Sequence, residues 1–132
     1  MGLINKLTLA IMSLVTSCTG IYGQNGFRTI DADEFEKAIS TDSVQLVDVR
    51  TADEFAEAHI SSDNIKNIDM KQPDFMERAK KELDKSKTIA VYCRSGRRSA
   101  EAAGRLAAEG FKVIDLDGGI LEWQARGKNT DK

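Results

Sequence analysis

The chain has 132 residues, of which 41% are hydrophobic and 30% are charged, and its formal net charge is −2. A length within about 100–200 residues allows one globular domain with a single hydrophobic core. The near-neutral charge excludes a general electrostatic attraction to nucleic acid or anionic lipid, so any positively charged site must be local.

The first 24 residues have the order of a secretory signal. Lys6 precedes an apolar run over residues 7–17, and small residues follow. The run is shorter than the roughly 20 residues of a membrane-spanning helix, so a transmembrane anchor is less favoured than export. The signal-like pattern also favours export over the alternative that this segment is the first helix of the domain. Val15-Thr16-Ser17-Cys18 resembles the lipobox of bacterial lipoproteins. Lipid attachment at Cys18 and soluble secretion after a later cleavage both stay open.

We therefore expect an exported protein, located in the periplasm or the cell envelope, whose mature domain covers residues 25–132. A membrane contact is expected only through a lipid anchor. Because Cys18 is removed or capped in either case, Cys93 is the one thiol of the mature body, which excludes an internal disulfide.

Helices and strands alternate along the body of the chain. Two helix starts carry capping residues three positions apart, Asp31 with Glu34 and Thr51 with Glu54. The expected strands cover residues 44–49, a short stretch within 64–70, then 88–92 and 112–116. Four helices are expected. The first follows Asp31, and the second follows Thr51 and ends near His59. The third carries Pro73 in its first turn, and the fourth covers residues 98–109 and stops at Gly110. Alternation with short connections predicts an α/β fold with a parallel sheet, whose ligands bind at the carboxyl ends of the strands.

The loop from Cys93 to Ser99 lies at such an end, between an apolar strand and a helix. Backbone amides of the turn and the positive end of the helix favour an anion at the cysteine sulfur. Arg94, Arg97 and Arg98 add positive charge within five residues. These features favour a thiolate, which is the nucleophilic form of cysteine, over a buried inert thiol.

The loop Cys93-Arg94-Ser95-Gly96-Arg97-Arg98 resembles the active-site signature of the rhodanese family, in which a strand leads to a cysteine, a six-residue loop and a helix. Two further segments resemble the family's first motif (Asp48-Val49-Arg50, Glu54-Phe55 and His59-Ile60) and its closing motif (residues 117–123). Together these segments cover residues 28–127. The chain departs from the family where Ala58 replaces a glycine and Ser61-Ser62 replaces a frequent Pro-Gly pair.

The resemblance implies a central parallel sheet of about five strands with helices on both faces. It implies a sulfurtransferase in which Cys93 takes a sulfane sulfur from thiosulfate or a similar donor, holds it as a persulfide, and passes it to a thiol or to cyanide. Arg94, Arg97 and Arg98 would bind the anionic part of the donor, and the loop amides, those of Ser95 and Gly96 included, would hold the persulfide. It implies no metal, no organic cofactor and no nucleic acid partner.

Four residues outside the loop have structural interpretations. Asp48 and Arg50 lie at a strand end, where an ion pair that supports a neighbouring loop is favoured over substrate contact. His59 is expected to be a hydrogen-bonded structural residue, and Trp123 to belong to the core or a pocket wall.

Three other functions are less favoured than sulfur transfer. A phosphatase or arsenate reductase of the related fold has arginine six residues after the cysteine, where this chain has Ser99. A non-catalytic binding or sulfur-relay module of the rhodanese fold would commonly lack the cysteine that is present here. A thioredoxin-like oxidoreductase would need a second, resolving cysteine near Cys93.

Overall fold

The computed structural model describes residues 26–132, so the predicted leader, including Cys18, lies outside the described residues. The strands are β1 (Phe27–Ile30), β2 (Val44–Asp48), β3 (His59–Ile60), β4 (Lys66–Asn67), β5 (Thr88–Tyr92), β6 (Val113–Leu116) and β7 (Thr130–Asp131). The helices are α2 (Ala32–Ile39), α3 (Ala52–Glu57), α4 (Phe75–Glu82), α5 (Arg97–Ala108) and α6 (Gly119–Ala125). Within this part of the chain, no helix is long and apolar enough to span a bilayer.

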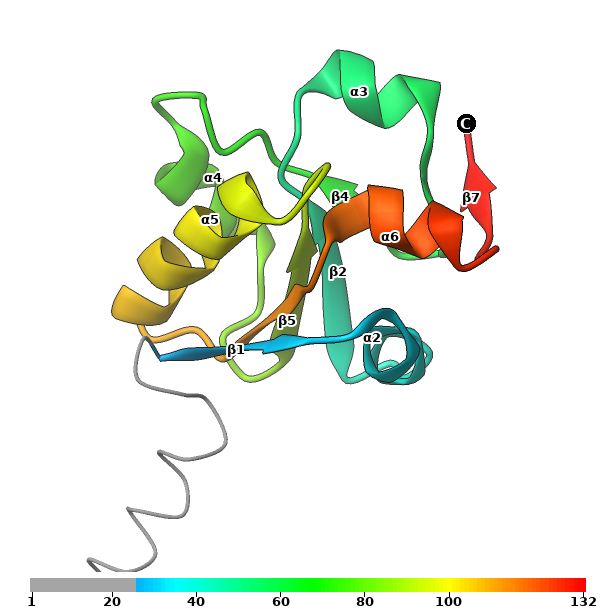
Figure 1. The fold of residues 1–132 in the computed structure, drawn as a ribbon. Coiled ribbons are helices and arrows are strands. Elements are labelled where there is room, and N and C mark those ends of the chain that lie inside the picture. Colours follow the sequence, from blue (N-terminus) through cyan, green and yellow to red (C-terminus); the bar gives the residue numbers. More distant parts are fainter. Residues whose placement is uncertain (1–25) are drawn as a thin grey trace, which may run out of the picture.

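Five strands form one parallel sheet in the order β1-β6-β5-β2-β4. The expectation of an α/β fold with about five parallel strands is therefore confirmed. The two short strands β3 and β7 pair antiparallel in a separate ribbon near the C-terminus (Figure 1). Neither the ribbon nor β1, in which only Ile30 is buried, was predicted from the sequence.

Helices cover both faces of the sheet, as expected. Successive residues of β5 alternate between two cores: Ile89 and Val91 pack with α4 and α5, whereas Ala90 and Tyr92 pack with α2 and α6. Cys93 continues this alternation on the α5 side, immediately after the strand ends. Because β5 is the central strand, the predicted nucleophile lies at the middle of the carboxyl edge of the sheet.

The helix starts follow the predicted capping signals with one exception. The Asp31 side chain accepts a hydrogen bond from the Glu34 amide at 2.9 Å, and Thr51 with Glu54 forms a complete capping box on α3. The prediction that Pro73 lies in the first turn of a helix is wrong. Phe75 begins α4, and its amide donates to the carbonyl oxygen of Gln72, so the proline belongs to the turn that precedes the helix.

Candidate active site

Cys93 lies at the carboxyl end of the central strand and is almost completely buried. It is 1% exposed and packs in the core formed with α4 and α5. In the described part of the chain it is the one cysteine, and its thiol is free. A reactant must therefore reach this sulfur through the loop that covers it.

The loop after Cys93 turns back over the sulfur because Gly96 has a positive φ of 110°. This left-handed conformation is accessible to glycine at little cost. It brings the Gly96 amide to 3.1 Å from Sγ of Cys93, to which it donates a hydrogen bond. The Ser99 hydroxyl in turn donates to the Gly96 carbonyl oxygen at 3.2 Å, which ties the loop to the first turn of α5. The arrangement stabilises negative charge on the sulfur.

The first turn of α6 supports the same loop through backbone hydrogen bonds. The amides of Ile120 and Leu121 donate to the carbonyl oxygens of Cys93 and Arg94 at 2.9 and 3.1 Å. Gly119 makes this approach possible, because a Cβ atom there would lie 2.6 Å from the Cys93 carbonyl oxygen and closer still to the carbonyl group of Arg94. In the sequence this glycine is recognisable only as part of the closing family motif, and its contact with the loop was not predicted.

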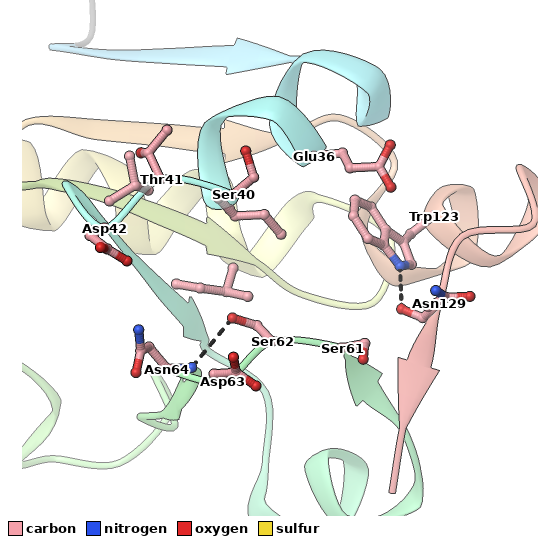
Figure 2. Close-up of a pocket in the computed structure, with 13 residues that line it drawn as sticks. Glu36, Ser40, Thr41, Asp42, Ser61, Ser62, Asp63, Asn64, Trp123 and Asn129 are labelled. Carbon is pink, nitrogen blue, oxygen red and sulfur yellow. Dashed lines mark hydrogen bonds between the residues drawn. The ribbon is translucent and has the colours of Figure 1, made fainter.

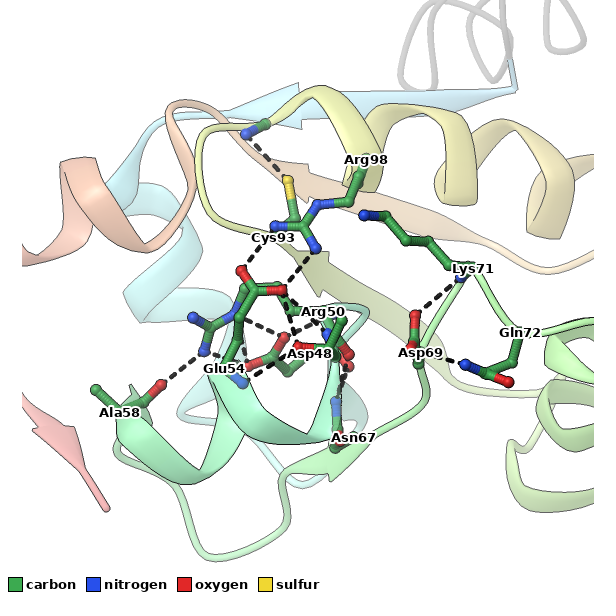
Figure 3. Close-up of polar contacts among 12 residues, drawn as sticks. Asp48, Arg50, Glu54, Ala58, Asn67, Asp69, Lys71, Gln72, Cys93 and Arg98 are labelled. Atoms are coloured by element: carbon green, nitrogen blue, oxygen red, sulfur yellow. Dashed lines mark hydrogen bonds and ion pairs between the residues drawn. The ribbon is translucent and has the colours of Figure 1, made fainter.

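The three loop arginines are in different environments. Arg94 and Arg97 are exposed, and within residues 26–132 neither side chain has an ion-pair partner within 4.0 Å. Arg98, by contrast, is partly buried and lies beside the sulfur of Cys93 (Figure 3). Ser95 is exposed at the tip of the loop. The structure thus brings the Gly96 amide and the Arg98 side chain to the sulfur, and it distinguishes Arg98 from the two exposed arginines of the loop.

Arg98 is bound by a carboxylate that the sequence analysis interpreted only as a helix cap. Both of its terminal nitrogens, Nη1 and Nη2, donate to the two oxygens of Glu54 at 2.8 Å. The hydrogen bonds from Arg98, followed by those from Thr51, lower the pKa of Glu54 from 4.5 to about 2. The Glu54 carboxylate is therefore ionised at any pH at which the protein is expected to work.

Asp48 and Arg50 form a buried ion pair beneath this site, as predicted. The guanidinium of Arg50 contacts both carboxylate oxygens of Asp48, the shortest distance being 2.7 Å. It also donates to the carbonyl oxygen of Ala58 at 2.6 Å. The Asn67 side chain donates to the carbonyl oxygens of Asp48 and Arg50, which joins β4 to the end of β2 and the residues after it. The pair thus fixes the β2–α3 connection, which precedes the helix that carries Glu54.

Lys71 is a further cation near the site that the sequence analysis did not single out. It follows β4, and its backbone amide donates to the Asp69 carboxylate at 2.9 Å. Its side chain extends toward Arg98 and Cys93 (Figure 3). In sequence this lysine is one of many on a polar surface, so only the course of the chain after β4 reveals its position.

His59 and Trp123 have the structural roles expected of them. Nδ1 of His59 is 2.9 Å from the Phe55 carbonyl oxygen, and the two rings stack. Trp123 is 2% exposed and donates through Nε1 to the Asn129 carbonyl oxygen at 2.8 Å. Within the described part of the chain, neither side chain is hydrogen-bonded to the loop that carries Cys93.

A separate pocket of about 410 Å³ opens on the α2 side of the sheet (Figure 2). Hydroxyl and carboxylate side chains dominate its lining, and Trp123 forms part of one wall. The pocket contains none of the predicted loop residues. Neither there nor elsewhere in the described part of the chain is a cluster of histidine, cysteine or carboxylate side chains arranged to hold a metal ion. This pocket is therefore separate from the loop that carries Cys93.

Comparison with known proteins gives consistent results. The family model for the rhodanese-like domain matches residues 31–126. Thiosulfate sulfurtransferase GlpE of Coxiella burnetii is 36% identical over 90 residues, which cover 67% of this chain and 78% of that protein. Putative sulfurtransferase YtwF of Bacillus subtilis is 32% identical over 93 residues, which cover 70% of this chain and 85% of that protein. A crystal structure of a rhodanese-like domain protein from Staphylococcus aureus, 31% identical, aligns with a TM-score of 0.63 over 74% of this chain and 91% of the other.

Proposed function

The chain belongs to the rhodanese-like family of sulfurtransferases and sulfur carriers, and we propose that it transfers a sulfane sulfur from thiosulfate, or a similar donor, to a thiol or cyanide acceptor through a persulfide on Cys93. The observation that carries this proposal is the free thiol of Cys93 directly after β5, with the Gly96 amide donating to its sulfur. An amide donor at this place stabilises the thiolate that attacks and the persulfide anion that results.

In the first step the thiolate of Cys93 attacks the outer sulfur of thiosulfate. The sulfur–sulfur bond of the donor breaks, its electron pair leaves with sulfite, and the outer sulfur stays on the enzyme as an anionic persulfide. In the second step the acceptor, cyanide or a thiolate, attacks the outer sulfur of the persulfide. Thiocyanate or a new persulfide leaves, and the Cys93 thiolate is restored without a change in the overall electron count.

The exposed arginines Arg94 and Arg97 are suited to binding the sulfonate of the donor and the departing sulfite, because no carboxylate within 4.0 Å in the described part of the chain neutralises either of them. Oxyanions bind guanidinium groups through short, charge-assisted hydrogen bonds. The slight exposure of Cys93, 1%, favours a slim sulfur donor over a bulky one. The proposed cycle uses protein side chains and backbone amides alone.

The proposal is tested with residues 25–132, thiosulfate and cyanide, with thiocyanate as the measured product and Cys93→Ser as the matched variant. We expect thiocyanate formation, and an intact mass increased by one sulfur atom after thiosulfate treatment, both lost in Cys93→Ser. Absence of both signals in the folded wild-type protein would refute thiosulfate as the donor and would favour a specialised sulfur relay or a binding role.

We further propose that residues 1–24 export the domain to the periplasm or cell envelope, with Cys18 as a lipid attachment site or as part of a removed signal. The pattern of Lys6, an apolar run and small residues supports export. The mature N-terminus distinguishes the two forms.

A further inference from the structure

We infer that Glu54 determines the donor specificity of this site: its carboxylate binds the guanidinium of Arg98 beside Cys93 and thereby weakens the binding of doubly charged donors relative to singly charged ones. The inference rests on the proposed sulfur transfer and concerns how the same site discriminates among anions.

The carboxylate of Glu54 contacts the guanidinium of Arg98 in the way that a bound anion would. Nη1 and Nη2 of Arg98 donate to Oε1 and Oε2 of Glu54, each at 2.8 Å. This parallel, two-point contact is also how a guanidinium binds the oxygens of an oxyanion. The side chains of Arg98 and Glu54 are 21% and 27% exposed, so the contact is partly shielded from water. An incoming donor therefore meets an arginine whose hydrogen-bonding edge is occupied.

Glu54 is held in place independently of Arg98. Its Oε1 accepts a hydrogen bond from the Thr51 amide at 3.2 Å, and its own amide donates to the Thr51 hydroxyl at 3.2 Å. The carboxylate is thus anchored at the start of α3 by the capping box, and not merely drawn to a neighbouring charge. Because Glu54 is anchored in this way, its contact with Arg98 should persist when a sulfur donor approaches the site.

The consequence is a reduced positive potential at the sulfur. Arg50 is neutralised by Asp48 and Arg98 by Glu54. Among the described residues, the uncompensated positive charge near the sulfur therefore comes from Arg94 and Arg97 of the loop and from Lys71 after β4. The interaction of a donor with one additional free guanidinium is proportional to the charge of the donor. Freeing Arg98 should therefore change the free energy of binding twice as much for thiosulfate, a dianion, as for a monoanionic alkyl thiosulfonate.

The test compares wild-type protein with Glu54→Gln, using thiosulfate and methanethiosulfonate as donors and cyanide as acceptor. Glutamine can still accept from the Thr51 amide, so the helix cap is preserved while the negative charge is removed. We expect KM to fall about threefold for methanethiosulfonate and about tenfold for thiosulfate, with kcat changed less than KM. High salt should reduce both effects, because the interaction between partly exposed charges is screened.

Two matched variants separate charge from stability. Thr51→Ala removes the cap of α3 but keeps the Glu54 charge, and Glu82→Gln removes a carboxylate from an exposed ion pair with Arg78, remote from the site. Glu82→Gln should not change the ratio of the two KM values. Thr51→Ala loosens Glu54 but keeps its charge, so it should change the ratio far less than Glu54→Gln does. Thermal unfolding of all four proteins verifies that they are folded under the assay conditions.

Direct binding makes the test independent of turnover. Thiosulfate binding to Cys93→Ser, with and without Glu54→Gln, should tighten about tenfold when the carboxylate is removed. Equal binding and unchanged KM values in Glu54→Gln would overturn the inference while leaving active wild-type protein as support for the proposed function. An equal change for both donors, or the same change in Thr51→Ala, would also overturn it. A wild-type protein that transfers sulfur from neither donor would refute both the proposed function and the inference that rests on it.

Discussion

Replacement of Gly119 by alanine should distort the loop that carries Cys93, although residue 119 is 26 positions away in the sequence. A Cβ atom at this position would lie 2.6 Å from the carbonyl oxygen of Cys93 and even nearer to the carbonyl group of Arg94. Because the colliding atoms belong to the backbone, no side-chain rotation can relieve the overlap. The β6–α6 turn and the loop must move apart.

The magnitude follows from the contacts that this movement breaks. The positive φ of Gly119, 61°, costs a residue with a side chain about 1 kcal/mol. Separation of the two segments also weakens the hydrogen bonds from the Ile120 and Leu121 amides, each worth about 1 kcal/mol. We therefore expect Gly119→Ala to lower the free energy of unfolding by about 3 kcal/mol, a large fraction of the stability of a small domain.

Gly127→Ala is the matched control. Its φ is 74°, but a Cβ atom there meets no other atom within 4 Å, so it should cost only the backbone strain of about 1 kcal/mol. The melting temperature of Gly119→Ala should accordingly lie about 10 °C below that of Gly127→Ala. Since displacement of a catalytic group by about 1 Å can reduce a rate about 100-fold, thiocyanate formation should fall sharply in Gly119→Ala alone. Equal unfolding free energies and equal rates for the two variants would refute the reasoning.

Two further predictions concern a buried carboxyl group and the leader. Burial raises the pKa of Asp115 from 3.8 to about 6, and among the described residues its Oδ1 has no hydrogen-bond partner, so the folded protein binds this proton more tightly than the unfolded chain. Stability should therefore decrease by about 2 kcal/mol as the pH rises from 4 to 7, and Asp115→Asn should remove that loss in urea unfolding at each pH; a parallel pH profile in the variant would contradict the assignment. For the leader, intact mass of the protein from bacterial envelopes should show either a lipid-modified N-terminal Cys18, lost in Cys18→Ala, or cleavage near residue 24, whereas an uncleaved chain would argue against export.

The α/β fold and the position of the Cys93 loop could be predicted from the sequence, because both depend on local residue patterns. The apolar runs around Leu46 and Val91 predict buried strands, and the capping pair Thr51 and Glu54 predicts the start of α3, irrespective of what lies nearby. Strand β1 gave no such pattern, because it is an edge strand in which Ile30 is the one buried residue. A strand exposed on most of its length has no strong apolar period to recognise.

Contacts between distant segments were not predictable in the same way. Glu54 satisfies the capping pattern completely, so nothing in the sequence indicates that the same carboxylate also binds Arg98, 44 positions later. Asp115 lies among buried positions of β6, and its burial becomes visible only when α5 and β1 cover that strand. For a charged residue with two roles, a single sequence can therefore reveal the local role but not the contact with a distant segment.

The structure also explains how the departures from the family pattern can be accommodated. Ala58, which replaces a glycine, has a φ of −167°, an extended conformation that any residue can adopt. Its contribution to the site is its carbonyl oxygen, which accepts a hydrogen bond from Arg50 at 2.6 Å, and a backbone acceptor does not depend on the side chain. Ser61 is held through its amide, which donates to the Asn129 carbonyl oxygen at 3.1 Å, and through its hydroxyl, which donates to the Asp131 carboxylate at 2.7 Å. Because Arg50 contacts only the backbone of Ala58, the replacement of the glycine leaves the network of Asp48 and Arg50 beneath the Cys93 loop intact.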